Sequence, residues 1–340
     1  MAYTTINKPN LHFNTVLYTG NGGTQSVTGV GFQPDLVWIK DRVATDYHWW
    51  TDAIRGATKT LHSNVATAET TQSTSLTAFG GSGFTLGSDA SVNRNGDTFV
   101  SWNWLGANTT VSNTLGTITS TVSANTTAGF SVLSYTGNGT SSPTFGHGLG
   151  VAPKFVIIKN RQATESWQVW LNNNIRLQMN TTNTSLGTLP ISTSSTLITL
   201  PTFDGAWNTS AVTYIAYCFA PIKGYSSFGS YTGNGSTDGT FVYTGFKPAY
   251  LMIKQSSASG EGWFILDNKR ETINPMGTLL IANDAGADNT SQNPILDFTS
   301  NGFKLRRTWS GVNGSGSTYI YAAFAEQPLV GTNNIPATAR

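Results

Sequence analysis

The alternation of apolar and polar residues along the chain has the period of a β-strand. In the stretch 36–40, Leu36 and Trp38 would point to one side of a strand and Val37 to the other. Only the region 58–70 has apolar residues spaced for a helical turn or two. Alternating segments separated by Gly- and Asn-rich turns every ~8–12 residues predict an all-β protein built as a sandwich or barrel.

This pattern occurs three times, roughly 100 residues apart, which is the size of a domain rather than of a solenoid unit of ~20–50 residues. Each copy begins with Tyr-Thr-Gly-Asn-Gly, continues with a proline followed six residues later by a lysine, and closes on an aromatic strand. The copies begin at Tyr18, Tyr135 and Tyr231, and their closing strands start near Phe99, Tyr214 and Tyr319. We therefore predict three tandem antiparallel β-sandwich repeats, with these three closing-strand aromatics each buried in its own core.

The repeats suggest domain boundaries. The prediction is an N-terminal segment and repeat one at 1–106, a linker at 107–128, repeat two at 129–224, repeat three at 225–330 and a C-terminal tail at 331–340. Residues 107–128 are rich in Thr, Ser and Asn and nearly uncharged, so they are predicted to form an extended linker or a solvent-exposed strand. The junction at 221–224 is short. Repeats two and three are thus expected to pack closely, with repeat one more free.

Composition excludes several classes of function. Only 11% of residues are charged, against ~25% in an ordinary domain, and the net charge is +2, so we expect no binding to nucleic acid. No stretch approaches the ~18 consecutive apolar residues of a membrane span, and the start lacks the pattern of a signal peptide. We expect that the chain does not insert into a membrane. We also expect that it is made in a cytoplasm. The single cysteine, Cys218, is expected to be a small buried residue.

Catalytic patterns are weak. A glycosidase needs two carboxylates ~5–9 Å apart, but the acidic residues lie mostly alone on polar turns, and Asp46 and Asp52 are six positions apart. The four histidines fall in no catalytic motif, and no cluster has zinc-ligand spacing. We predict a protein that is not an enzyme and has no cofactor or metal. A calcium ion in a loop near Asp89 or Asp284 stays open.

Two residue types recur at one register. Lys40, Lys159 and Lys254 could contact a ligand, but a strand-end lysine that protects a sheet edge is the favoured interpretation. Trp49, Trp167 and Trp263 could stack on sugar rings, but a shared core position is favoured.

The best candidate for a ligand-binding patch consists of Tyr47, His48 and Trp50, the aromatic residues of this strand that recur least. Adjacent residues of a strand face opposite sides, so either Trp49 or Trp50 is expected to be exposed or at an interface.

Several motifs resemble one family. The start at 1–9, the segment 31–40, the Asp-Ala-Ile-Arg-Gly turn at 52–56 and the end at 319–326 are similar to virion structural proteins of tailed phages from aquatic bacteria. Those proteins carry repeated domains of the concanavalin-like (jelly-roll-like) sandwich type. The resemblance covers nearly the whole chain. Repeat two departs from it, because it lacks the Arg-Gly turn of repeat one and the Gly-Phe pair of its neighbours.

The resemblance implies a structural protein of the virion surface. We expect a homo-oligomer that contacts other virion proteins, as a compact capsid-decoration or tail-fibre component with lectin-like modules for host-surface glycans. The alternatives are a glycan-degrading tailspike-type enzyme and a free carbohydrate-binding protein. The position on head or tail, the oligomeric state and the identity of any glycan stay open at this point.

Overall fold

The structure is a computed structural model that describes residues 3–172, 174–187, 189–202, 204–331 and 336–338. Nearly all its regular structure is β-strand, and only η1 (Pro9–Leu11), α1 (Ala90–Asn93) and α2 (Ser310–Asn313) are helical in these residues. The prediction of an all-β protein is confirmed.

The strands fall into three units that are contiguous in sequence, each with one large and one small antiparallel sheet. The first unit contains β1 (Phe13–Thr19), β2 (Gln25–Val27), β3 (Leu36–Asp41), β4 (Trp49–Asp52), β5 (Lys59–His62), β6 (Thr70–Thr71), β7 (Leu76–Gly80), β8 (Gly83–Leu86) and β9 (Thr98–Trp104). Its large sheet has the order β1-β9-β3-β4-β5-β6 and its small sheet the order β2-β8-β7.

The second unit contains β10 (Val111–Asn113), β11 (Ser120–Asn125), β12 (Phe130–Thr136), β13 (Thr144–Gly146), β14 (Phe155–Asn160), β15 (Gln168–Leu171), β16 (Ile175–Gln178), β17 (Ser192–Thr193), β18 (Leu197–Thr199) and β19 (Thr213–Phe219). The orders are β10-β11-β12-β19-β14-β15-β16 and β13-β18-β17.

The third unit contains β20 (Ser226–Thr232), β21 (Phe241–Tyr243), β22 (Phe246–Gln255), β23 (Trp263–Asp267), β24 (Leu280–Ile281), β25 (Leu296–Thr299), β26 (Gly302–Leu305) and β27 (Thr318–Pro328). The orders are β20-β27-β22-β23-β24 and β21-β26-β25.

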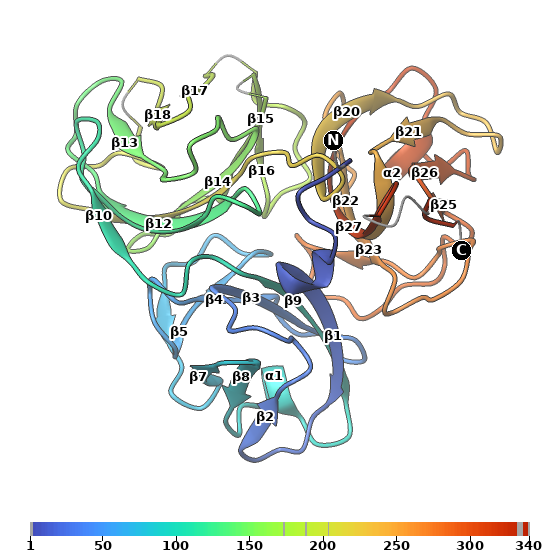
Figure 1. The fold of residues 1–340 in the computed structure, drawn as a ribbon, viewed down its shortest axis with the longest axis horizontal. Coiled ribbons are helices and arrows are strands. Elements are labelled where there is room, and N and C mark those ends of the chain that lie inside the picture. Colours follow the sequence, from blue (N-terminus) through green and yellow to red (C-terminus); the bar gives the residue numbers. More distant parts are fainter. Residues whose placement is uncertain (1–2, 173, 188, 203, 332–335, 339–340) are drawn as a thin grey trace.

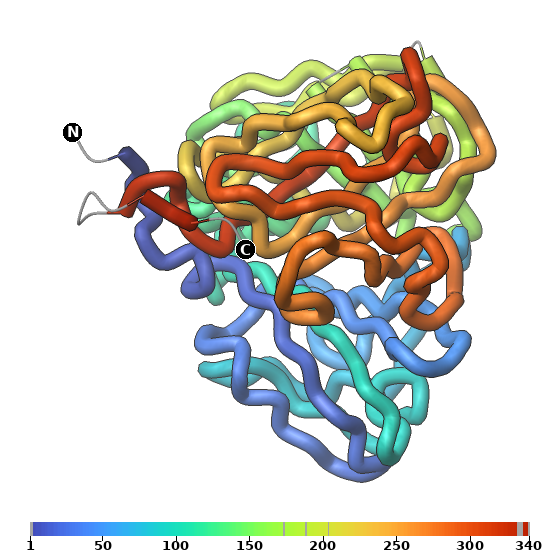
Figure 2. The backbone as a smooth tube through the Cα atoms, turned by 90° about the vertical axis from the view of Figure 1, so that its right-hand side faces the viewer, coloured from blue at the N-terminus to red at the C-terminus, as the bar shows by residue number. Residues whose placement is uncertain are grey.

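The central strands of each large sheet are buried on both faces. On one face the sheet packs against the small sheet of its own unit, as Phe99 of β9 does with Leu86 of β8. On the other face the three large sheets meet in one hydrophobic cluster, the central cluster, to which Trp102, Tyr217 and Phe324 each contribute from a different unit. Figure 1 shows the units as three lobes around this centre, and Figure 2 shows the first unit lying against the other two. The expectation that repeat one is more free is therefore wrong, because its aromatic face is buried by the other units.

Residues 107–128, predicted as a linker or exposed strand, do more than connect two repeats. They supply β10 and β11 to the edge of the second unit's large sheet. Val122 of β11 is buried among residues of the second unit's own core. The segment is polar because β10 and the turns around it face solvent, and the apolar residues that anchor it, Ile118 and Val122, stand isolated in the sequence.

The three units share the register between their first and closing strands. The equivalent pairs are Tyr18 with Phe99, Tyr135 with Tyr214 and Tyr231 with Tyr319. The two rings of every pair stack with centroids 5.1 Å apart. The closing-strand ring has an exposed fraction of 0% in all three units and belongs to a different core cluster in each. The prediction of separate cores around these residues is confirmed.

The contacts of the Tyr-Thr-Gly-Asn-Gly motif are internal to each unit. In the first copy, the N–H of Asn21 donates to Asn93 Oδ1, and Asn93 Nδ2 donates back to Asn21 Oδ1. Gly20 lies so close to Arg94 that an added Cβ would be 2.2 Å from its carbonyl oxygen, and Gly22 has a φ of +70°. The same amide exchange joins Asn138 to Asn208 and Asn234 to Asn313. The motif therefore fixes the turn after the first strand.

Candidate functional site

The predicted patch of Tyr47, His48 and Trp50 does not form a surface in the structure. Tyr47 is 46% exposed, but His48 and Trp50 are 0% and 1% exposed. Trp50 lies in the central cluster, while Trp49 packs in the first unit's own core. Of the two outcomes expected for these tryptophans, exposure is wrong, because the sheet is covered on both faces here. The interface is confirmed for Trp50, which packs against Trp167 and Tyr217 of the second unit. Tyr47 is the member of the patch that solvent reaches.

The sheet register also corrects the alignment of the recurring tryptophans. The facing pairs in the three units are Trp38 with Trp50, Ile157 with Val169 and Met252 with Ile265. The second members of these pairs, Trp50, Val169 and Ile265, are equivalent. The residues two positions before them are therefore also equivalent, and they are His48, Trp167 and Trp263. Trp49 is therefore not the counterpart of Trp167. The first unit carries its indole at position 38, where the other units have smaller aliphatic side chains.

The residue at this position connects each unit to the next. The indole N–H of Trp167 donates to the carbonyl of His62 in the first unit, at 2.8 Å. Trp263 makes the same bond to Gln178 of the second unit, at 3.0 Å. His48 faces the carbonyl of Ile281 in the third unit, in a weaker contact than the indole hydrogen bonds. These contacts run around the molecule in one direction and close a ring of three units.

His48 is held in its neutral form by its surroundings. The indole N–H of Trp38 donates to His48 Nδ1 at 2.9 Å, which leaves the ring proton on Nε2, toward the third unit. Burial lowers the pKa of His48 well below its ordinary value, and the nearby charges of Lys40 and Arg270 lower it further. This histidine therefore serves as a neutral hydrogen-bonding spacer between units.

The recurring lysines are buried and fasten loops. Lys40, Lys159 and Lys254 each have an exposed fraction of 0% and lie on interior strands of their sheets. Lys40 Nζ donates to the carbonyls of Asp41 and Ala44, at 2.6 and 3.2 Å. The other two lysines make equivalent pairs of bonds. Neither interpretation offered by the sequence holds, because these lysines neither protect a sheet edge nor reach a ligand from solvent.

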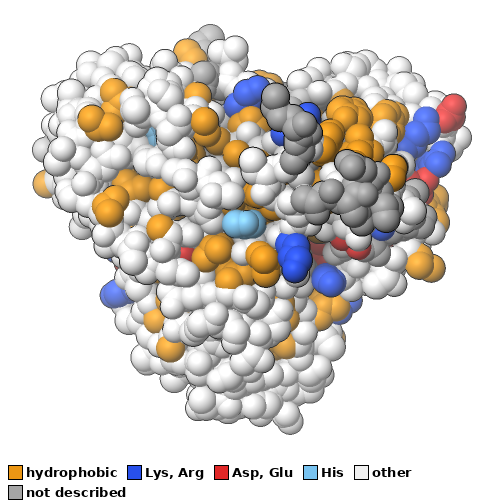
Figure 3. Space-filling model, in the orientation of Figure 1, with side chains coloured by type: hydrophobic (Ala, Val, Ile, Leu, Met, Phe, Trp, Pro, Cys, Tyr) orange, Lys and Arg blue, Asp and Glu red, His pale blue; other side chains and the backbone are white. Residues whose placement is uncertain are grey.

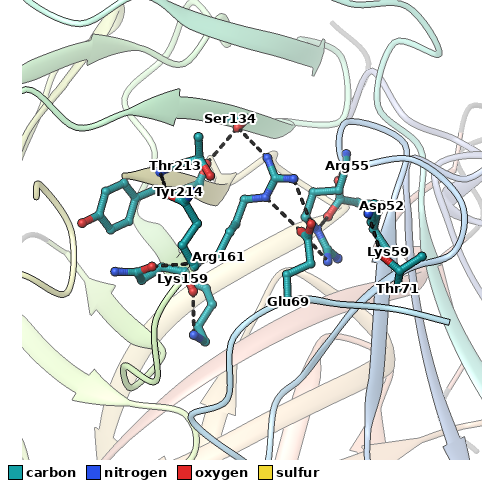
Figure 4. A network of polar contacts seen from close by, with 12 residues as sticks. Asp52, Arg55, Lys59, Glu69, Thr71, Ser134, Lys159, Arg161, Thr213 and Tyr214 are labelled. Carbon is teal, nitrogen blue, oxygen red and sulfur yellow. Dashed lines mark hydrogen bonds and ion pairs between the residues drawn. The ribbon is translucent and has the colours of Figure 1, made fainter. Parts of the chain in front are cut away.

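A buried ion network joins the second unit to the first (Figure 4). Asp52 Oδ2 accepts from Arg55 Nε at 2.5 Å and from the hydroxyl of Tyr217 at 2.8 Å. Glu69 accepts two bonds from Arg161 of the second unit, at 2.9 and 3.0 Å, and lies 3.4 Å from Arg55. In Figure 4 both guanidinium groups point at Glu69. The Asp52 and Arg55 side chains have exposed fractions of 0%, so the carboxylates and the guanidinium groups neutralise each other inside the interface.

The same network joins the first unit to the third. Asp267 Oδ2 accepts from Arg270 Nε at 2.6 Å and from the indole N–H of Trp102 at 3.2 Å. Asp288 accepts from Arg270 at 2.9 Å and from Arg42 of the first unit at 2.7 Å. Trp102 occupies in β9 the position that Tyr217 occupies in β19. Two of the three junctions therefore use one ionic design.

The third junction, between the third and second units, lacks that network. Arg42 and Arg161 are replaced there by Ser256, whose carbonyl accepts from the N–H of Ser185 and the hydroxyl of Thr184. Lys254 reaches the carbonyl of Thr182 at 3.4 Å. The reason is that the second unit lacks a counterpart of the Asp52–Arg55 and Asp267–Arg270 pairs.

The charged groups of the two ionic junctions are engaged in contacts between units. The carboxylates of the two ionic junctions point at guanidinium groups between units rather than into a cleft. Asp89 caps the N–H of Ser91, and Asp284 accepts from the N–H of Gly286. Among the described residues, no group of three or more His, Cys, Asp or Glu side chains is placed to hold a metal ion. No helix in the same residues is long and apolar enough to cross a membrane.

Sequence reasoning missed an exposed aromatic pair in the third unit. Phe241 and Tyr243 of β21 are 44% and 57% exposed, with Val242 between them facing the core. The register of the small sheets places Ser26 and Thr144 at the position of Phe241. Comparing the copies position by position would have shown this difference.

A family model described as "Domain of unknown function (DUF7483)" matches residues 8–328. The match begins just before η1 and ends with β27, so it spans all three units. No curated protein and no solved structure matches the chain.

Proposed function

We propose that this chain, which belongs to the family described as Domain of unknown function (DUF7483), is a non-enzymatic structural protein of a phage virion surface. It is a homo-oligomeric, compact capsid-decoration or tail-fibre component in contact with other virion proteins, and its units are concanavalin-like sandwiches. The motifs at 31–40, 52–56 and 319–326, which resemble virion structural proteins of tailed phages, support this proposal.

The observation that carries the proposal is the central cluster. Three tandem copies with independent cores could form separate domains joined by linkers, but they bury their remaining apolar faces against one another. Figures 1 and 2 show the resulting compact body. A body of this kind covers or caps a surface, whereas a fibre shaft needs an extended repeat. Compactness therefore favours a decoration or a globular tail component.

The placement of the ionisable groups supports a non-enzymatic role. A general acid or a nucleophile has to reach its substrate. Asp52 and Asp267 are fully buried, and each is bound to an arginine three residues away. These charges hold the units together, which is a structural task.

Attachment to host-surface glycans is the second candidate, and it rests on the exposed rings of Phe241 and Tyr243. Contiguous exposed apolar side chains mark surfaces that contact ligands or proteins. Figure 3 shows few charged side chains on the visible face and hydrophobic side chains gathered over the third unit near β20 and β21. Phe241 lies opposite Lys304, whose charge is neutralised by Asp238, so exposed rings beside a balanced ion pair suit an uncharged saccharide.

The structural role is tested on purified particles of a phage that encodes this chain. Mass spectrometry should find the chain in stoichiometric amounts with the major virion proteins, and a reconstruction of the particle should show three-lobed density on its surface. Absence from washed particles would overturn the proposal.

Two measurements test the ligand and the chemistry. In a glycan screen, Tyr243→Ala should abolish any binding that the unmodified chain shows, while Tyr47→Ala should keep it. Incubation with host polysaccharide should release no reducing sugar. Turnover that a single Asp or Glu substitution removes would favour the tailspike-type enzyme.

A further inference from the structure

The first strands of the first and second units differ in what lies beside them. β12 has a strand on each side, β19 and β11. β1 has the same place in the first unit and pairs with β9, but it ends its sheet, and no other strand of the described residues pairs with it. The second unit therefore covers an edge that the first unit leaves open.

Three residues of β1 direct their backbone N–H and C=O groups to the open edge. At the start of the β1–β9 ladder, the N–H of Leu105 donates to the carbonyl of His12. Hydrogen bonds alternate in direction along an antiparallel strand, so the N–H and C=O groups of Phe13, Thr15 and Leu17 face away from β9. The equivalent residues of β12 face β11, in the pairs Phe130 with Asn125, Val132 with Ser123 and Ser134 with Thr121.

A crevice adjoins this edge at the junction with the third unit. Its volume is about 60 Å³, and its walls include Phe13 and Thr15 of the first unit and Ala249, Asn268 and Ala325 of the third. Thr15 Oγ1 and Asn268 Oδ1 are buried and have no hydrogen-bond partner among the described residues. Thr15 and Asn268 are each 4% exposed. Buried polar atoms in native proteins normally have partners. This edge is thus incomplete as it stands.

The chain itself shows what fills the equivalent place. At the junction of the second unit with the first, β11 lies along β12, and its Ser123 hydroxyl donates to Asp35 Oδ1 at 2.7 Å. Asn125 of β11 donates to the carbonyl of Leu105 at 3.1 Å. Asp35 and Leu105 hold in the first unit the positions that Ala249 and Ala325 hold in the third. The crevice beside β1 is the counterpart of a site that a strand occupies elsewhere in the same molecule.

The sequence of β1 does nothing to block such an addition. Natural sheets protect their edges with charged residues, proline or bulges. β1 has the sequence Phe-Asn-Thr-Val-Leu-Tyr-Thr, with no charge and no proline, and it pairs with β9 over its whole length without a register shift.

We propose that the free edge of β1 and the adjoining crevice bind an extended segment of a partner protein, which adds to the sheet as an antiparallel strand in the register of β11 on β12. A small hydroxyl-bearing residue of the partner lies opposite Thr15, as Ser123 lies opposite Val132. The crevice is too small for a large side chain at this point.

The register is tested by disulfide trapping on the full chain. The probe is a synthetic peptide with the sequence of residues 119–126 in which Thr121 is replaced by Cys, and the chain carries Leu17→Cys. Leu17 is 38% exposed and lies where Ser134 faces Thr121. Crosslinking of Leu17→Cys should be at least ~10-fold faster than that of the control chain Ser134→Cys, because β11 already covers the edge at Ser134. It should also be at least ~10-fold faster than crosslinking of Leu17→Cys to a control peptide that has its cysteine at Val122 instead of Thr121. Equal rates in all three experiments would overturn the proposal.

Hydrogen exchange tests the edge without a new cysteine. The peptide of residues 119–126 should slow exchange of the Thr15 and Leu17 amides at least ~10-fold in the unmodified chain. It should leave the Thr15 amide unchanged in Leu17→Pro, which removes one outward N–H. Unchanged exchange in the unmodified chain contradicts strand addition. A dimer of the chain that Leu17→Pro dissociates would overturn the assignment to a partner protein, because the occupant would be a second copy.

Discussion

Replacing Asp52 by Asn removes the negative charge at the centre of the junction between the first and second units. Asp52 accepts bonds from the N–H and Nε of Arg55 and from the hydroxyl of Tyr217. The Arg55 guanidinium would stay buried, with Glu69 at 3.4 Å as its remaining carboxylate partner. Breaking one side of a buried ion pair costs about 3–5 kcal/mol, because the other charge is left without compensation.

The expected result is a fall in melting temperature of roughly 4–7 °C, since an unfolding entropy of about 2.1 cal/mol/K per residue makes 1 kcal/mol worth about 1.4 °C in a chain of this length. Thermal unfolding followed by circular dichroism and by tryptophan fluorescence measures it. The matched control is Asp238→Asn, which removes an ion pair to Lys304 from a side chain that is 86% exposed. The control should leave the midpoint nearly unchanged.

A double variant separates the charge from the shape. Replacing both Asp52 and Arg55 by leucine and methionine leaves no uncompensated charge, so it should recover part of the stability that Asp52→Asn loses. An Asp52→Asn variant with the melting temperature of the unmodified chain would show that the buried network does not hold the units together. That result would refute the reasoning about the junctions.

Three further predictions concern single buried groups. Burial lowers the pKa of His62 to about 4, so the unfolded chain binds this proton first as the pH falls below about 6.5. The stability that His62 contributes should be complete above that pH and should fall by roughly 3 kcal/mol by pH 4, so urea titrations should find the loss on acidification smaller in His62→Gln by about this amount. His48→Trp should destabilise by about 1–3 kcal/mol through overpacking, and adding Trp38→Met should restore stability, because the pair then matches Trp263 and Met252; urea unfolding of both variants decides this. Burial raises the pKa of Cys218 to about 12, so a thiol reagent at pH 8 should label it only in denaturant, and rapid labelling of the native chain would contradict its placement.

The local elements were readable from the sequence because their causes are local. The period-two alternation at 36–40 indicated β3, and the recurrence of the closing aromatics indicated that Phe99, Tyr214 and Tyr319 hold one position. The buried asparagines were missed, although Asn93 and its two counterparts each precede the closing aromatic by six residues. That signal was in the sequence and a stricter comparison of the copies would have found it.

The candidate site was not readable in the same way. Alternation indicates which side chains share a face of a strand, but it says nothing about what covers that face. Trp50 and His48 therefore looked available until the second and third units were seen to bury them. The ionic junctions were equally hidden, since Arg161 and Glu69 lie 92 positions apart and are brought together by the packing of two units.

The sequence by itself determined the repeated β-unit, because strand period, turn residues and core aromatics act over a few neighbouring positions. The tertiary structure alone decided that the three units close around one core, that 107–128 adds strands to a sheet, and that the edge of β1 stays open. The closure around one core depends on contacts between segments that lie far apart in the sequence, as Arg161 and Glu69 do at 92 positions, and no local pattern encodes it. β11 pairs with the nearby β12, but its segment is too polar to reveal this in the sequence. The sequence therefore encodes the same β-unit three times, while the packing of the units decides how they contact one another and which surface is left for a partner.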